Sequence, residues 1–193
     1  MRLSYTIIGI LIVLTSPVVT FAQDISFQDI NPLESFTDYY VAKYKPKFEA
    51  LTTKYTNVPI TPGVLIQFSN DVSQLENEFS QERREDYESF RKVTTLQQSC
   101  TNGVSGKTKV CPAPTITCPS DFKLVSEESF ITGGGAAELS RSNTEISWQV
   151  SKSGKGRNEG TAVVHCSYSD DFISNTVANE IKEIKKLAGF GDS

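Results

Sequence analysis

The placement of the cysteines constrains the fold of this chain more than any other sequence feature. Three of the four cysteines, Cys100, Cys111 and Cys118, lie in one turn-rich stretch, SCTNGVSGKTKVCPAPTITCPSDF (residues 99–122), and the fourth is Cys166. In an exported chain, an even number of cysteines indicates disulfides. A four-cysteine zinc site would show paired C-x2-4-C spacing, which is absent here. We therefore expect two disulfides, no metal and no other cofactor.

The sequence favours one of the three possible cysteine pairings without excluding the others. The segment between Cys100 and Cys111 contains two glycines and an Asn-Gly pair, so it can close a hairpin-like loop. That leaves Cys118 to pair with Cys166, which lies far downstream on a strand-like segment. In the chain-entropy model, closing such a long loop contributes on the order of 4 kcal/mol.

The N-terminus has the pattern of a secretory signal peptide. Arg2 precedes an apolar run over residues 7–14, and Pro17 and a small residue, Ala22, follow it. The alternative is a membrane anchor, but the apolar core is well short of the roughly 20 residues that a bilayer requires. We expect residues 1–22 to be removed and the mature chain to be secreted or extracytoplasmic (periplasmic if bacterial), without membrane insertion.

A helical region is predicted over residues 23–98. It opens at Asn31-Pro32, where Asn31 can cap a helix and Pro32 suits its first position. Because Pro46 falls inside the helical pattern, we expect a kink or a short break near Lys45. The apolar residues recur at spacings of three and four along one stripe: Leu33, Phe36, Tyr40, Tyr44, Phe48, Leu51 and Tyr55.

A second helical pattern follows the breaker NVPITPG (residues 57–63), and the charge run SQERRED (residues 80–86) interrupts its stripe. Mixed charges of this kind indicate a solvent-exposed helix face. Two long helices joined by a short breaker most economically form an antiparallel helical hairpin. The alternative is a homo-oligomer whose helices pair between chains, although the heptad spacing is not sustained. The stripe comprises Phe68, Val72, Leu75, Phe79, Tyr87, Phe90 and Val93.

After a cysteine-rich junction (residues 99–120), the apolar period changes from helical to alternating. The segments EISWQVSK and TAVVHCSY alternate as half-buried strands do, so residues 121–169 should form a small antiparallel, sandwich-like β unit stapled by the disulfides. Trp148 belongs to its core rather than to a sugar-stacking surface. A C-terminal amphipathic helix and tail, residues 170–193, follow, with Asp170 or Asp171 as the cap. The predicted fold class is α+β.

The residues that carry chemistry do not assemble into a catalytic site. His165 is the only histidine, and the alternating pattern points it away from the core. The pairs Glu127-Glu128 and Asp170-Asp171 are neighbours in sequence, whereas a glycosidase needs two carboxylates across a cleft. We expect no enzymatic activity, and a secreted hydrolase is the least favoured alternative. The net charge of −4 argues against a nucleic-acid partner.

The connection SKSGKGRNEG (residues 151–160) is the best candidate for recognition. Lys152, Lys155 and Arg157 surround its glycines, and binding residues concentrate on loops that a rigid scaffold presents. Arg157 and Asn158 suit a carboxylate, a sulfate or a sugar hydroxyl. We predict a secreted, non-enzymatic binding protein that presents such loops to a glycan, peptide or protein partner. The alternative is a self-associating structural or assembly protein with a helical stalk.

Overall fold

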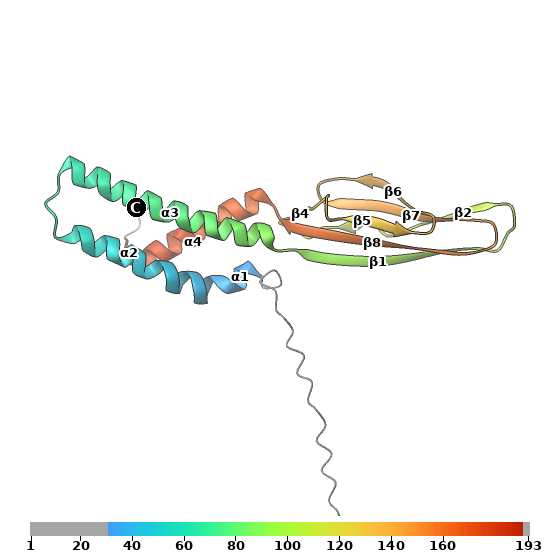
Figure 1. Ribbon diagram of the computed structural model, residues 1–193, viewed down its shortest axis with the longest axis horizontal. Coiled ribbons are helices and arrows are strands. Elements are labelled where there is room, and N and C mark those ends of the chain that lie inside the picture. Colours follow the sequence, from blue (N-terminus) through green and yellow to red (C-terminus); the bar gives the residue numbers. More distant parts are fainter. Residues whose placement is uncertain (1–30, 191–193) are drawn as a thin grey trace, which may run out of the picture.

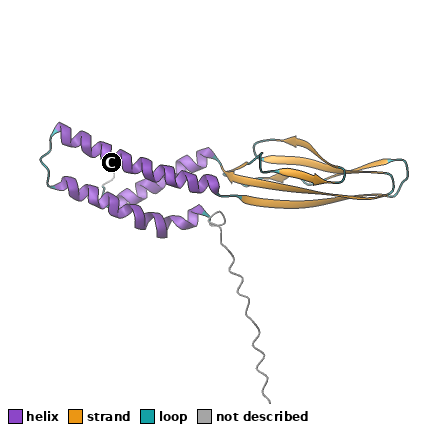
Figure 2. Ribbon diagram, viewed as in Figure 1, coloured by secondary structure: helices purple, strands orange, loops and turns teal. Residues whose placement is uncertain are grey.

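The computed structural model describes residues 31–190, apart from the side chains of residues 35, 37 and 38. The predicted signal peptide, residues 1–22, lies outside the described residues. Helices form one end of the elongated molecule and antiparallel sheets the other (Figures 1 and 2), which confirms the α+β class. The helical elements are α1 (Pro32–Ser35), the π-helical η2 (Phe36–Tyr40), α2 (Val41–Thr56), α3 (Pro62–Ser89) and α4 (Asp170–Leu187).

The strands form two antiparallel sheets, each built around one long strand. In the first, β8 pairs with β1, β4 and β5, and in the second, β7 pairs with β2, β3 and β6. The strands are β1 (Lys92–Asn102), β2 (Thr108–Pro112), β3 (Ile116–Thr117), β4 (Phe122–Leu124), β5 (Phe130–Gly133), β6 (Ala136–Arg141), β7 (Glu145–Ser153) and β8 (Gly156–Tyr168).

The helical region ends earlier than the predicted boundary at residue 98. Helix α3 stops at Ser89, and strand β1 begins at Lys92, so Val93 lies on a strand and not on the helical stripe. The β-branched run Val93-Thr94-Thr95 favours a strand, and β1 pairs with β8 along its whole length. The predicted junction over residues 99–120 therefore contains the end of β1 and the whole of β2 and β3, joined by short connections.

The first and the last helix, α1 and α4, both begin with side-chain caps. The Oδ1 atom of Asn31 accepts a hydrogen bond from the Leu33 N–H (3.1 Å), as the sequence predicted. Helix α4 is capped by Ser169, whose Oγ accepts from the Phe172 N–H (3.3 Å). The predicted cap at Asp170 or Asp171 is wrong, because these carboxylates lie in the first turn, where the helix dipole favours negative charge.

Pro46 does not break the second helical element. Helix α2 continues through Pro46 to Thr56, and the departure from α-helical hydrogen bonding lies upstream, in η2. The short break predicted near Lys45 is therefore absent. Tyr44 and Phe48, which flank the proline, are both fully buried, and their packing offsets the loss of one backbone hydrogen bond.

The apolar stripes of the helices face one another within the single chain. Helix α2 packs against α3 and α4, and aromatic rings meet edge to face, as between Tyr44 and Phe79 (centroids 5.1 Å apart). No helix within residues 31–190 is long and apolar enough to cross a bilayer. The buried cluster comprises Phe36, Tyr40, Tyr44, Phe48, Leu75, Phe79, Tyr87, Tyr168, Ile173, Val177, Ile184 and Ala188.

One charged side chain from the predicted exposed run is at the centre of this bundle. Arg83 is 0% exposed, so the prediction of a solvated face is wrong at this position. Its Nε and Nη2 donate to the two carboxylate oxygens of Glu180 on α4 (2.8 and 2.6 Å), and Nη2 also donates to the Pro32 carbonyl (2.7 Å). The guanidinium carbon lies 4.4 Å from the Tyr40 ring centroid. Arg83 therefore connects α3 to α4 and to the start of α1.

The carboxylate of Glu180 has a second donor, the Tyr87 hydroxyl (2.7 Å). Burial, reinforced by this hydrogen bond, raises the pKa of Tyr87, so the hydroxyl remains a donor. Burial by itself opposes the charge on Arg83, but the hydrogen bond and charge of Glu180 keep the pKa of Arg83 above its usual value. The Arg83–Glu180 pair is therefore hydrogen-bonded on both sides, the condition under which buried charges are tolerated.

A second buried cluster lies between the two sheets. Trp148 is 1% exposed and its Nε1 donates to the Pro114 carbonyl (3.1 Å), which confirms its place in the core. The Cys100–Cys111 disulfide joins β1 of the first sheet to β2 of the second. The Cys118–Cys166 disulfide joins the residue that follows β3 of the second sheet to β8 of the first. The cluster comprises Cys100, Ile116, Cys118, Leu124, Ile146, Trp148, Val150, Ala162, Val164 and Cys166.

The disulfides have the pairing that the sequence favoured, Cys100–Cys111 and Cys118–Cys166. Cys100 lies near the far end of β1, and Cys166 lies opposite Lys92, at the end nearest the helices. One bridge therefore joins the sheets near each end of the β unit, instead of joining the β unit to the helices. Disulfides indicate an oxidising, extracytoplasmic location.

An aromatic cluster attaches the helices to the sheets. The Tyr168 ring at the end of β8 stacks on Phe172 of α4 (centroids 4.8 Å apart) and contacts Phe122 of β4 (4.3 Å). Tyr87 and Phe90, at the end of α3, contact the same ring. Because α3 leads into β1 and β8 leads into α4, this contact aligns the long strands with the bundle (Figure 1).

Replacing Arg83 with Met should lower the free energy of unfolding by about 3–5 kcal/mol, because it leaves the Glu180 carboxylate buried without its cation. The double variant Arg83→Met/Glu180→Leu should recover part of that loss, since it removes the unpaired buried charge but leaves the Tyr87 hydroxyl without its Glu180 acceptor. Urea denaturation measures both. The control, Arg84→Met, removes a neighbouring exposed cation and should change stability by less than about 1 kcal/mol. A single Arg83→Met variant as stable as the wild type would contradict this assignment.

The two disulfides should contribute unequally to stability. Replacing Cys118 and Cys166 with Ala opens the longer loop and should lower the free energy of unfolding by about 4 kcal/mol, against about 3 kcal/mol for Cys100 and Cys111. Denaturation of each double variant beside the oxidised wild type measures the difference. Equal losses, or free thiols in alkylated, unreduced protein, would refute the expectation.

Candidate binding site

The end of the β unit farthest from the helices is rich in basic side chains. There, the β1–β2 connection and the β7–β8 connection lie side by side, because β1 and β8 pair from the helical end out to Asn102 and Gly156 (Figure 1). Lys109 of β2 also lies directly opposite Lys152 of β7. We call the following set the cationic tip: Lys107, Lys109, Lys152, Lys155 and Arg157.

Carboxylates are scarce around the cationic tip. Residues 89–120 contain none, and residues 146–169 contain only Glu159, which pairs with Arg157 (N–O 2.7 Å). Within residues 31–190, the four lysine ammonium groups of the tip form no ion pair. A chain with a net charge of −4 therefore has a locally positive end.

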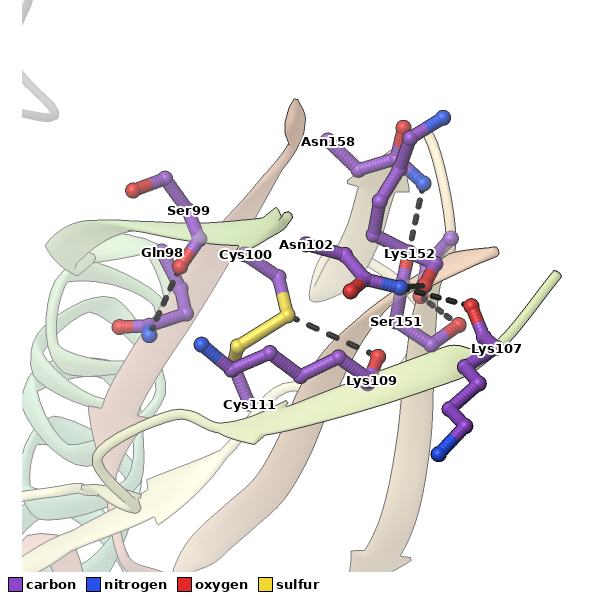
Figure 3. Close-up of a disulfide and its surroundings, with 11 residues drawn as sticks. Gln98, Ser99, Cys100, Asn102, Lys107, Lys109, Cys111, Ser151, Lys152 and Asn158 are labelled. Atoms are coloured by element: carbon purple, nitrogen blue, oxygen red, sulfur yellow. Dashed lines mark hydrogen bonds between the residues drawn. A yellow bond between two sulfur atoms is a disulfide. The ribbon is translucent and has the colours of Figure 1, made fainter. Parts of the chain in front are cut away.

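The buried side-chain amide of Asn102 connects the two backbone segments that form the tip. Asn102 is 5% exposed, and its Nδ2 donates to the Lys107 carbonyl (2.7 Å) and to the Lys152 carbonyl (3.2 Å) (Figure 3). Its Oδ1 accepts from the Val104 N–H (3.0 Å). The Cys100–Cys111 disulfide lies next to it, one inward-facing position closer to the core (Figure 3). Both connections that carry the lysines are therefore tied to the same strand end.

Two of the four predicted recognition residues already have a partner within the chain, and two form no ion pair among the described residues. Lys152 and Lys155 form no ion pair among the described residues, whereas Arg157 is paired with Glu159. Asn158 donates from Nδ2 to the Ser151 carbonyl (2.6 Å), so its amide bridges β8 and β7 (Figure 3). A ligand-binding role for these four residues stays a prediction, and Asn158 already has a structural partner.

Sequence analysis missed Lys107 and Lys109, which precede the predicted loop by more than forty positions. They join the tip because β2 pairs with the end of β7, and that pairing is a long-range contact. The available signal was a pair of lysines in a segment devoid of carboxylates, but its partner strand was not evident from local patterns.

A shallow hollow lies on the first sheet beside the tip. Its volume is about 270 Å³, and its walls carry amides, hydroxyls and one ion pair, but no aromatic ring. The lining residues are Gln97, Gln98, Ser99, Arg157, Glu159, Gly160 and Thr161. Groups of this kind exchange hydrogen bonds with polar ligands and offer little apolar area.

His165 lies at the other end of the β unit, where Glu128 faces its ring. Its side chain is 24% exposed, and Nδ1 lies 3.5 Å from the Glu128 Oε2 atom. That carboxylate also accepts two hydrogen bonds from Arg91 (2.8 and 3.0 Å). The nearby Ser129 hydroxyl bonds the backbone of His165 rather than its ring. This arrangement joins the α3–β1 connection to the β unit.

Two cations near the helix–sheet junction, Arg91 and Lys123, are also paired. A hollow of about 430 Å³ lies there, but Arg91 is paired with Glu128 and Lys123 with Asp170 (2.8 Å). Among residues 31–190, no group of three or more His, Cys, Asp and Glu side chains is arranged to hold a metal ion. The cationic tip is therefore the strongest candidate site.

Replacing Glu128 with Gln should lower stability at neutral pH by at most about 1 kcal/mol, because the carboxylate is partly exposed. The hydrogen bonds from Arg91 lower the pKa of Glu128, so its contribution exists above the unfolded-state pKa and is lost as pH falls through the lower folded-state pKa. Urea denaturation should therefore show a difference from the wild type at pH 7 that becomes smaller at about pH 3. Glu127→Gln is the control, and an equal loss at both pH values would contradict the ion pair.

No protein-family model matches the sequence, and neither a curated protein nor a solved structure is significantly similar to the chain.

Proposed function

We propose that the chain is a secreted, non-enzymatic binding protein that presents the distal end of its disulfide-stapled, sandwich-like β unit to a glycan, peptide or protein partner. The observation that carries this proposal is the cationic tip, where four lysines without an ion pair among the described residues gather in a chain of net charge −4. Clustered positive charge attracts anionic partners and accelerates their association.

The arrangement of the molecule also supports this proposal. The tip is at the end of two long paired strands, away from the helical bundle, where a large partner can approach it (Figure 2). Asn102 and the Cys100–Cys111 bridge tie its two connections together. A surface whose backbone is already ordered loses less entropy when it binds.

The environment of His165 favours binding over hydrolysis. Its ring faces Glu128, which Arg91 already neutralises, and no hydroxyl or thiol of the described residues contacts the ring as a nucleophile. All four cysteines are oxidised. A hydrolase would need an activated nucleophile or a pair of carboxylates across a cleft. The contacts of His165 support such a site less than the unpaired lysines of the cationic tip support binding.

A second candidate, self-association through the helical end, is favoured by one observation. The α2–α3 connection and the start of α3 carry no charged residue between Lys54 and Asp71, and Ile60 is 82% exposed there. Contiguous exposed apolar side chains mark interaction surfaces. Light scattering of the mature chain, residues 23–193, tests this candidate. A monomer rejects self-association, whereas a dimer that dissociates in the Ile60→Ser and Ile66→Ser variants supports it.

The test of the first proposal is a matched pair of charge variants. One removes the tip lysines (Lys107, Lys109, Lys152 and Lys155→Gln), and the other removes four lysines elsewhere (Lys45, Lys92, Lys182 and Lys186→Gln). Both lower the net charge equally, and Lys45 of the control set also loses its exposed ion pair with Glu49. On an array of glycans and peptides, we expect the tip variant to lose at least about tenfold in affinity for any ligand found, and the control to lose little. Equal losses would reject the tip as the binding site.

A further inference from the structure

Strand β1 forms a long free edge of the first sheet. It pairs with β8 over Lys92–Asn102, and within residues 31–190 its backbone makes no backbone–backbone hydrogen bond beyond that ladder. Figure 1 shows β1 as the outermost strand along the lower side of the β unit. In an antiparallel ladder only alternate residues bond the neighbouring strand, so about half of the β1 amide and carbonyl groups point away from β8.

Each of the other described edge strands has a feature that discourages further pairing, whereas β1 has none along most of its length. Proteins protect sheet edges by short strands, charges, proline and bulges. Strands β3, β4 and β5 have two to four residues, β2 ends in Pro112, and the register of β6 shifts between Glu138 and Ser140. Strand β1 has eleven residues, no proline, an unbroken register and one charge, Lys92, at its start. Such an edge is expected where pairing with another chain is functional.

A free strand edge is chemically specific for extended peptide. It offers amide donors and carbonyl acceptors at a fixed spacing, and only another polypeptide backbone presents the complementary groups at that spacing. The side chains in the middle of β1 do not oppose such a partner, because the stretch VTTLQQ (residues 93–98) carries no charge. The backbone therefore favours a peptide over a glycan at this edge.

The charge around β1 favours an acidic peptide. Residues 89–120 contain no carboxylate, and Lys92, Lys107 and Lys109 form no ion pair among the described residues. At the helical end, the last turn of α3 carries the exposed residues Glu85 and Glu88. Positive charge is therefore concentrated at the end of β1 that leads into the cationic tip, and acidic residues of a partner are attracted there.

The lysines that follow β1 extend from ordered backbone. Asn102, the last residue of β1, donates to the Lys107 carbonyl (2.7 Å), and the Lys109 carbonyl lies 3.7 Å from the Cys100 Sγ (Figure 3). The Cys100–Cys111 disulfide joins β1 to β2 at the same place. A strand that pairs with the far half of β1 would therefore end within reach of these two lysine side chains.

We infer that the free edge of β1 binds an extended acidic peptide, which adds to the first sheet as an antiparallel strand. This inference rests on the proposed function, and it names a peptide as the partner and a strand edge as the docking surface. All strand pairs of both sheets are antiparallel. Because β1 ends at the cationic tip, the N-terminus of an antiparallel partner lies there, so its acidic residues are N-terminal and contact Lys107 and Lys109.

The first test measures affinity for designed peptides. The mature, oxidised chain is titrated calorimetrically with a capped peptide of three acidic residues followed by an alternating Thr-Val stretch. Two matched controls have Lys in place of the acidic residues, or N-methyl groups on the central amides, which remove the strand donors. We expect each control to bind at least about tenfold more weakly. The variant Lys107→Gln/Lys109→Gln should also lose affinity for the acidic peptide, and Lys182→Gln/Lys186→Gln should not.

The second test locates the peptide by amide hydrogen exchange. In the free chain, alternate amides of β1 should exchange rapidly, because they have no partner strand. Saturation with the acidic peptide should slow these amides by about tenfold or more, and leave the β8 amides unchanged. Binding without protection of β1 would overturn the inference. Slow exchange of every β1 amide in the free chain would also overturn it, since a second copy or residues 23–30 would then cover the edge.

The outcomes separate this inference from the proposed function. Equal binding of the acidic and the basic peptide, or of the N-methylated one, would overturn the inference alone. If no peptide binds, but the four-lysine tip variant loses another ligand on the array, the inference fails and the proposed function stands. If the acidic peptide binds equally well to the wild type and to the four-lysine tip variant, both fail.

Discussion

The buried guanidinium of Arg83 is the interaction on which the rest of the molecule depends. It joins α3 to α4 through Glu180 and to the start of α1 through the Pro32 carbonyl. Helix α3 leads directly into β1, and β8 leads directly into α4. A fixed contact between α3 and α4 therefore also sets how the two longest strands leave the bundle. The Tyr168 ring, packed on Phe172 and Phe122, continues the same alignment into the sheets.

The two ends of the molecule are stabilised by different physical means. The bundle uses aromatic packing around one buried ion pair, whereas the small β unit has two disulfides, one near each end of its core. A β unit of this size buries limited apolar surface, so covalent bridges between its sheets compensate for a small core. The bridge at Cys100–Cys111 also fixes the strands that carry the lysines, so the same bond serves stability and the geometry of the cationic tip.

Local chemistry in the sequence predicted much of the fold. The Asn31-Pro32 helix start, the apolar stripe from Phe36 to Phe48, the core position of Trp148 and both disulfide pairings are as expected. These features depend on capping, helical or alternating periodicity, and loop length, which short segments contain.

Features that depend on long-range contacts were not predicted. Arg83 occurs in a charge run typical of an exposed face, and only the packing of α4 against α3 supplies its buried partner, Glu180. Strand β1 was assigned to the preceding helical region because its pairing with β8 joins residues far apart in the chain. Lys109 joined the candidate site for the same reason, through its register with Lys152. In each case, a partner distant in sequence decides the outcome.

The central claim is that recognition occurs at the end of the β unit and not on the helical bundle. The most direct measurement is an NMR titration of the isotopically labelled mature chain with a sulfated oligosaccharide, followed through backbone amide shifts. The account predicts saturable shifts confined to the tip and the adjacent hollow, around Lys109, Lys152 and Arg157. Amide shifts centred on the helices, or no amide shifts at a large excess of the oligosaccharide, would contradict it.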